Sequence, residues 1–328
     1  MRDLREELEK ARNQIRKLDA EFTEETKKEF ALLKEGMQRR KEDGKGWEEL
    51  LKSMPVDLSK LLEHDKADER RAESILKELE PRLKTTPKET VLQTQEHLRW
   101  DGLLNAELVA AADGPTRFSI SQAYDGNGTV ERFHSTDSGG ATEGSCGDIV
   151  LGSGYPPIYG MYPRAYSKGS GSGWQDFNTV LARCWLWFYI PSAYVPRPGA
   201  LYVWPYFDLH GYYWVRANDG YFSSKEARIT LKMHMRLFRD DYQYAPWFTW
   251  VVLDRGNGNI DEDGRVDYTG WHTQSKGILH MLGEETVRVQ VIAELRTHAE
   301  GSGSHALLDF QTGENNWIRI PRVSGILV

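Results

Sequence analysis

The first part of the chain has the hydrophobic spacing of an amphipathic helix. Its apolar residues recur at intervals of three and four and begin with Leu4, Leu8, Ala11, Ile15, Leu18 and Phe22. Charged residues fill most positions between them, and the pattern lasts almost three heptads, so it predicts a coiled-coil-like arm. The phase slips by one residue before Phe30, and a small intramolecular bundle is therefore the alternative to an extended coiled coil.

Turn and capping residues divide the N-terminal region further. Gly44 is expected to interrupt the first helix, and Pro81 is expected to end a second one. Thr86-Pro87-Lys88-Glu89 has the composition of a helix start, with a capping threonine and a proline in the first helical position. We therefore expect a helical arm over residues 1–85 and a linking helix over residues 86–112.

Beyond residue 113 the hydrophobic period changes from 3.6 to 2. Apolar and polar residues alternate without error over residues 227–237, as in a strand with one buried face. Strands follow one another without a helical crossover, which predicts an antiparallel β-sandwich of about eight strands over residues 113–328 and an α+β fold overall. Asp125-Gly126-Asn127-Gly128 is expected to form a hairpin turn. A Gly-, Ser- and Tyr-rich stretch over residues 135–175 is expected to be a long functional or interface loop.

The charges are unevenly distributed along the chain. Residues 1–88 contain 22 basic and 22 acidic residues, whereas the remaining 240 contain 20 and 27, which accounts for the whole net charge of −7. Neither part is basic, so we expect no nucleic-acid partner. No apolar run is long enough to span a membrane, and the N-terminus lacks the apolar segment of a secretory signal. Synthesis in the cytoplasm is expected, and signal-independent release is left open.

The chain has two cysteines, Cys146 and Cys184. Two are too few for a disulfide framework or for a zinc site of clustered thiolates. Reduced thiols are favoured because no signal peptide is apparent, and one disulfide between the two is the alternative.

Aromatic residues concentrate in one segment of the predicted sandwich. Twelve of the 30 residues from Trp185 to Trp214 are aromatic, against 11% in the whole chain. Alternation sends some of these rings to each face of a sheet, so they cannot all enter one core. A core combined with an oligomer interface is one interpretation, and a carbohydrate-binding platform is the other. The candidate ligand-binding residues are Trp185, Trp187, Trp204, Tyr206, Tyr212 and Trp214.

An acidic segment follows the aromatic one. Asn259, Asp261 and Asp263 place oxygen ligands at alternate positions before a glycine, and Asp267 could add another. Such oxygens suit Ca²⁺, although the spacing departs from the EF-hand loop, which needs a glutamate where Gly270 stands. This segment is therefore interpreted either as a calcium site or as an acidic hairpin turn.

Two other patterns bear on catalysis and on contacts between surfaces. Asp208 and His210 share a strand face, and Asp208 or Asp254 could serve as acid or base in a glycan-acting hydrolase, but a structural Asp–His hydrogen bond is more common. A basic stripe is expected to be a solvated sheet face or to pair with the acidic surface of a neighbouring subunit. Its members are Lys225, Arg228, Lys232, His234 and Arg236.

No sequence motif specifies a catalytic mechanism, so we favour a non-catalytic structural or assembly protein. In this hypothesis the seam at Leu4, Leu8, Ile15, Leu18 and Phe22 mediates oligomerisation or docking to a protein partner, and the sandwich is the head. A carbohydrate-binding module, assisted by calcium or not, is the first alternative. A hydrolase on a β-sandwich is the second.

Overall fold

The structure is a computed structural model that describes most of the chain. The described residues are 4–53, 58–84, 116–121, 123–134, 140–151, 159–170, 177–218, 225–239, 242–271, 277–313 and 315–328. The expected linking helix over residues 86–112 lies outside them.

Two helices precede fifteen strands in the described part of the chain. The helices are α1 (Leu4–Ser53) and α2 (Leu58–Lys84), and a short 3₁₀ helix, η1 (Ser192–Tyr194), lies between strands. The strands are β1 (Thr116–Ile120), β2 (Ala123–His134), β3 (Ala141–Ser145), β4 (Ile149–Leu151), β5 (Tyr159–Met161), β6 (Arg164–Lys168), β7 (Phe177–Ile190), β8 (Pro198–Ala217), β9 (Glu226–Arg239), β10 (Tyr242–Asn257), β11 (Ile260–Trp271), β12 (Gly277–Leu282), β13 (Val287–Glu300), β14 (His305–Asp309) and β15 (Trp317–Leu327).

The strands form two antiparallel sheets that face each other. The five-stranded sheet has the order β10-β9-β13-β7-β2. The ten-stranded sheet has the order β3-β6-β14-β8-β15-β5-β4, with β1 beside β15 and with β11 and β12 beside β8. The inward side chains of both sheets make one large apolar core. The predicted α+β fold with an antiparallel sandwich is confirmed, with more strands than expected.

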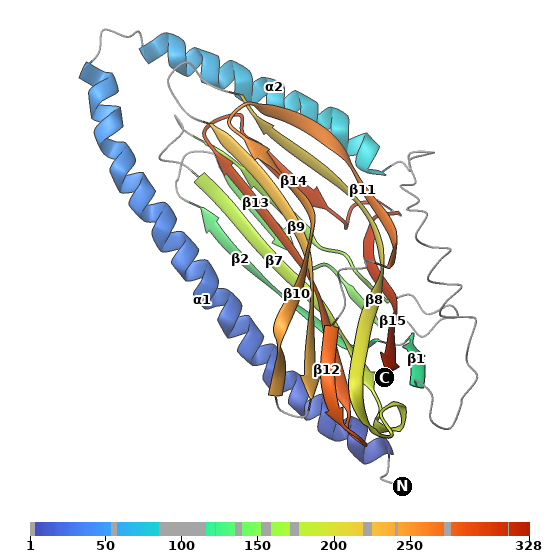
Figure 1. The fold of residues 1–328 in the computed structure, drawn as a ribbon. Helices are drawn as coiled ribbons and strands as arrows, with labels where there is room; N and C mark the ends of the chain where they lie inside the picture. Colours follow the sequence, from blue (N-terminus) through green and yellow to red (C-terminus); the bar gives the residue numbers. More distant parts are fainter. Residues whose placement is uncertain are drawn as a thin grey trace.

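Helix α1 covers the outer face of the five-stranded sheet, and Figure 1 shows it running along the length of the strands. Near its N-terminal end, Ile15 and Phe22 pack against Trp185 and Trp187. This explains why β7 is apolar at nearly every position: one face meets the other sheet and the other face meets the helix, so all 14 of its residues are buried.

Helix α2 covers part of the outer face of the ten-stranded sheet, on the opposite side of the strands from α1 (Figure 1). Its residues Ala72 and Leu79 pack against Tyr212 and Trp214 of β8. The molecule therefore has four layers, with one helix outside each sheet.

The first apolar stripe is consequently not left free for a partner. Ile15, Phe22, Phe30 and Met37 of α1 are buried against this chain's own strands, and Leu18 and Leu33 are partly buried beside them. That run includes the phase slip before Phe30, which an ordinary helix with 3.6 residues per turn requires when it lies straight on a sheet. Leu4 and Leu8 belong to α1, but their side chains lie outside the described residues.

Four local predictions are wrong. Helix α1 continues through Gly44, and α2 continues through Pro81 to Lys84. The residues of the expected hairpin turn instead lie inside β2. Gly126 is needed there for close packing, because a Cβ at this position would come within 2.6 Å of the Ile149 side chain. The described parts of residues 135–175 contain four short strands rather than one long loop.

The described residues include two free thiols, Cys146 and Cys184. Burial raises the pKa of Cys184 well above its ordinary value, and a hydrogen bond with the Cys146 thiol raises it further. Neither α1 nor α2 is long and apolar enough in its described residues to cross a membrane.

Candidate functional site

The predicted basic stripe lies under α1. Because side chains alternate along β9, Arg228, Lys232, His234 and Arg236 all point to the outer face of the five-stranded sheet, where α1 packs. The stripe has an acidic partner in the same chain and not in a neighbouring subunit as expected, since Arg236 Nη2 lies 3.6 Å from Glu25 Oε2 of α1. Lys225 is an exception, since its Nζ lies 3.5 Å from Asp68 of α2.

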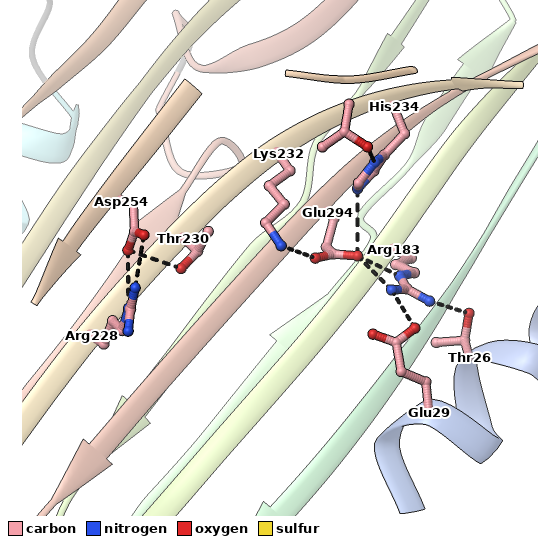
Figure 2. Close-up of polar contacts among 10 residues, drawn as sticks. Thr26, Glu29, Arg183, Arg228, Thr230, Lys232, His234, Asp254 and Glu294 are labelled. Atoms are coloured by element: carbon pink, nitrogen blue, oxygen red, sulfur yellow. Dashed lines mark hydrogen bonds and ion pairs between the residues drawn. The ribbon is translucent and has the colours of Figure 1, made fainter. Parts of the chain in front are cut away.

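Glu294 of β13 is the centre of a buried ion cluster (Figure 2). It accepts a hydrogen bond from Arg183 Nε at 2.7 Å, and Lys232 Nζ and His234 Nε2 each lie 3.5 Å from its carboxylate. Burial alone would raise the pKa of Glu294, but His234 and Arg183 outweigh burial and hold it well below its usual range. The carboxylate is therefore ionised and is paired with these three neighbouring side chains.

Arg183 connects this cluster to α1. Its guanidinium, which is almost fully buried, donates to Glu29 Oε2 at 2.7 Å and to Thr26 Oγ1 at 3.1 Å, both on the helix (Figure 2). Asp19 adds a second polar anchor, because one of its oxygens accepts from the indole N–H groups of Trp185 at 2.6 Å and Trp187 at 2.8 Å. These contacts hold α1 in one register on the sheet.

A groove of about 480 Å³ opens between α1 and the same sheet, and we call it the α1 groove. Four helix residues line it on one side, and seven residues of β9, β10 and β13 line it on the other. They are Leu33, Gly36, Met37 and Arg40 of α1, with Glu226, Arg228, Thr230, Lys232, Asp254, Arg296 and His298 of the sheet. Gly36 leaves the helix side open, because a Cβ added there would meet nothing within 4 Å.

Not every charged side chain of the α1 groove has an ion-pair partner within the described residues. Arg228 donates two hydrogen bonds to Asp254, at 3.0 and 2.8 Å, and Lys232 is engaged by Glu294 (Figure 2). Arg296, in contrast, forms no ion pair within the described part of the chain. Burial lowers its pKa, and the nearby acidic groups only partly offset that effect. Arg40 adds another cation at the rim.

The predicted aromatic platform is not exposed. Trp185 and Trp187 are covered by α1, and Tyr212 and Trp214 are covered by α2, so these rings are buried and hold the helices. Trp204 is also buried. Tyr206 is half-buried, and its ring already contacts the Trp271 ring and the Arg322 guanidinium.

The residues of the predicted calcium site do not converge. Asn259 is in a turn, but Asp261, Asp263 and Asp267 lie along β11, and the first and last are separated by about 20 Å at ~3.4 Å per residue. Each carboxylate has a protein partner. Arg216 pairs with Asp261, Tyr212 donates to Asp263, and His210 and Arg265 lie against Asp267.

Asp208 and His210 do meet, as part of a larger cluster. His210 lies between two carboxylates, with Nε2 3.0 Å from Asp208 and Nδ1 2.9 Å from Asp267. Hydrogen bonds to Asp208 and then Asp267 raise its pKa to about 9. His210 is therefore charged at neutral pH, and Asp208 and Asp254 both have a lowered pKa. This arrangement favours a structural ion cluster over the acid and base of a hydrolase.

The oligomerisation residues have partners within the chain wherever their side chains are described. Ile15 and Phe22 are buried against the sheet, and Leu18 is partly buried beside them. Sequence reasoning missed Arg296 and His298 of the α1 groove. An available signal was the polar phase of β13, where ionisable residues occupy every second position from Glu294 to Glu300.

Comparisons with known proteins assign the chain to no family. No family model and no curated protein matches the sequence. Among solved structures, the enzymatically active domain of tailspike protein 4 from bacteriophage CBA120 is 8% identical, with a TM-score of 0.17 over 61% of this chain and 19% of that chain. A structure of carbohydrate-binding modules from the β-sandwich superfamily is 13% identical, with a TM-score of 0.17 over 58% of this chain and 56% of that chain.

The structure of TmCBM61 in complex with β-1,4-galactotriose is 9% identical, with a TM-score of 0.12 over 55% of this chain and 83% of that chain. At TM-scores this low, none of these likenesses bears on what the present chain binds.

Proposed function

We propose that this protein is a binding protein that holds a small anionic ligand in the α1 groove. The observation that supports this most directly is Arg296, a half-buried guanidinium in the wall of the groove with no ion pair in the described part of the chain. Burial of a charge without a counter-charge costs free energy. A ligand carboxylate or phosphate would supply the counter-charge through two parallel hydrogen bonds.

The other residues that line the α1 groove indicate which chemical class of anionic ligand it suits. Leu33 and Met37 offer an apolar wall, Thr230 offers a hydroxyl, and Arg40 offers a second cation. A volume of about 480 Å³ is within the usual range for small-molecule sites. Among carbohydrates, the groove suits an acidic sugar, because a neutral sugar would leave the Arg296 charge unpaired.

Assembly through α1 stays a prediction. The apolar stripe of the helix is used within the chain, so a second protein or a second copy would have to contact its outward face. Leu32 and Leu50 on that face are exposed apolar residues, whereas Ile15 and Phe22 are not available.

Isothermal titration calorimetry with two matched sugars tests the proposal. D-glucuronate and D-glucose differ by one carboxylate, and we expect glucuronate to bind at least about 10-fold more tightly, the effect of one charge-assisted hydrogen bond. Arg296→Gln should remove this preference. It should not destabilise the free protein, because burial already disfavours the Arg296 charge.

Variants at Gly36 locate the binding site. Gly36→Trp should fill the groove and abolish binding, whereas Gly36→Ala, which has room for its methyl group, should bind as the wild type does. Inorganic phosphate as a third probe separates the two anion classes, and a preference for it over glucose would identify a phosphate-bearing ligand. Equal affinity for all three probes, or a preference that survives in Arg296→Gln, would contradict the proposal.

A further inference from the structure

A second cluster of ionisable side chains lies beside the α1 groove, where β9 begins and β13 ends. Glu226 and Glu300 are directly opposite each other on these two adjacent strands, and His298 is two residues from Glu300 on the same face. One ligand atom from each of the three residues lies within 4.8 Å of the other two. Glu226 and His298 also line the groove.

Neither carboxylate forms an ion pair with a lysine or an arginine within the described residues. Like charges directly opposite on neighbouring strands repel each other. Glu300 has a side chain only 6% exposed, and its one ion-pair contact in the described part of the chain is His298 Nε2 at 3.8 Å, beyond hydrogen-bond distance. The nearest guanidinium on β9, Arg228, is already bound by both oxygens of Asp254.

The imidazole of His298 is oriented as a ligand. Its Nδ1 lies 2.8 Å from Thr179 Oγ1, and the Thr179 hydroxyl is placed to donate to Met37 Sδ at 3.7 Å. Thr179 Oγ1 is then the acceptor for an Nδ1–H, so the Nε2 lone pair faces the glutamates. A hydrogen bond of this kind from the distal ring nitrogen is what fixes metal-binding histidines in most proteins.

From these contacts we infer that Glu226, His298 and Glu300 bind a divalent transition metal ion, with zinc as the first choice. One imidazole nitrogen with two carboxylates suits zinc and its neighbours in the first transition row better than Ca²⁺ or Mg²⁺, which prefer oxygen alone. Three protein ligands leave a coordination position open. That position faces the α1 groove, because Glu226 and His298 line it.

Zinc titration of the full-length protein, stripped of metal with a chelator, tests this inference. We expect one saturable zinc ion per chain by isothermal titration calorimetry, and a rise in melting temperature on zinc addition. Glu226→Gln and Glu300→Gln should each weaken zinc binding at least about 10-fold. Without metal, both variants should melt at the wild-type temperature or above it, because each removes the repulsion between two carboxylates.

Glu143→Gln is the matched control, since Glu143 is an exposed carboxylate on β3 of the other sheet, paired with Arg164. It should bind zinc as the wild type does, and so should Arg296→Gln, which tests the anionic ligand separately. If Glu300→Gln fails to fold by circular dichroism, the half-buried Glu226→Gln decides the question. No saturable zinc binding by the wild type, or equal binding by wild type and Glu226→Gln, would overturn the inference.

Discussion

The two helices pack on opposite faces of the sandwich, and the charged side chains beneath them differ in how completely they are paired. Helix α2 docks around Asp68, whose carboxylate receives Arg216 at 2.8 Å, Asn218 at 2.9 Å and Lys225 at 3.5 Å. Helix α1 docks through apolar contacts, through the Asp19 anchor, and through Thr26 and Glu29, which accept hydrogen bonds from the buried Arg183. Farther along, it leaves a groove in which Arg296 forms no ion pair within the described residues.

This difference distinguishes charged side chains that hold two elements together from a charged side chain that is available to a ligand. A buried ion with a complete set of partners holds two elements together, and removing one partner strands the others. The half-buried Arg296 has no such set of partners, and it is the residue for which we propose a ligand. A third case is the half-exposed His210 of β8, whose imidazole lies between two carboxylates.

The largest effect is expected at the α2 contact. Asp68→Ala leaves Arg216 and Lys225 buried without this carboxylate, and we expect a loss of about 3–5 kcal/mol in the free energy of unfolding. Glu73→Ala removes half of an exposed pair with Lys168 and should cost less than ~1 kcal/mol. Urea denaturation measures both, and equal losses would mean that burial does not distinguish these pairs.

Asp68 should also make the α2 contact sensitive to acid. Burial would raise its pKa, but Asn218, Lys225 and Arg216 outweigh burial and lower it. The stabilisation is thus present above the ordinary pKa of 3.8 and lost as the pH falls through the lowered value. The difference in the free energy of unfolding between wild type and Asp68→Ala should therefore disappear at acid pH.

An intermediate effect is expected at the α1 anchor. Asp19→Ala leaves two buried indole N–H groups without an acceptor, and we expect a loss of about 2–3 kcal/mol in the free energy of unfolding. Asp19→Asn keeps an acceptor and should remain within about 1 kcal/mol of wild type at pH 7. Thermal and urea denaturation compare the two, and an Asn variant as unstable as the Ala variant would show that the charge itself holds the helix.

The pH dependence at Asp19 runs opposite to that at Asp68. Burial raises the pKa of Asp19, and the two indole hydrogen bonds only partly offset this. Its contribution is therefore present below the ordinary pKa and lost as the pH rises through the raised value. Relative to wild type, Asp19→Asn should gain stability between pH 3 and pH 7.

The smallest effect is expected at His210, outside both helix contacts. Its pKa of about 9 lies above the ordinary 6.5, so its stabilisation is complete below pH ~6.5 and lost as the pH rises through about 9. His210→Gln should cost about 1–2 kcal/mol at pH 6, after solvent screening, and almost nothing at pH 10. His280→Gln, at an exposed position, should change the free energy of unfolding equally at both pH values. A loss that does not depend on pH for His210→Gln would contradict the ion cluster.

Local patterns predicted some features and missed others for identifiable reasons. The alternation in β9 and β13 marked both as strands, because a buried face repeats every second residue in any sheet. The two glycines of residues 125–128 suggested a turn, yet they lie inside β2, where Gly126 leaves room for the Ile149 side chain and Gly128 for the Cys146 side chain. The aromatic excess was visible in the sequence, but the cover of Trp185 and Trp214 by two different helices was not.

The sequence by itself determined the elements of this protein: amphipathic helices, a run of alternating strands, a surplus of aromatic residues and a basic stripe on β9. Each of these follows from periodicities set by backbone geometry within one element. Only the tertiary structure decided that the apolar stripe of α1 meets this chain's own sheet, that the basic stripe lies beneath that helix, and that Arg296, His298, Glu226 and Glu300 gather at one groove. These outcomes depend on which surfaces pack together and in what register, and the buried contacts that decide them join residues more than a hundred positions apart, such as Asp19 and Trp185.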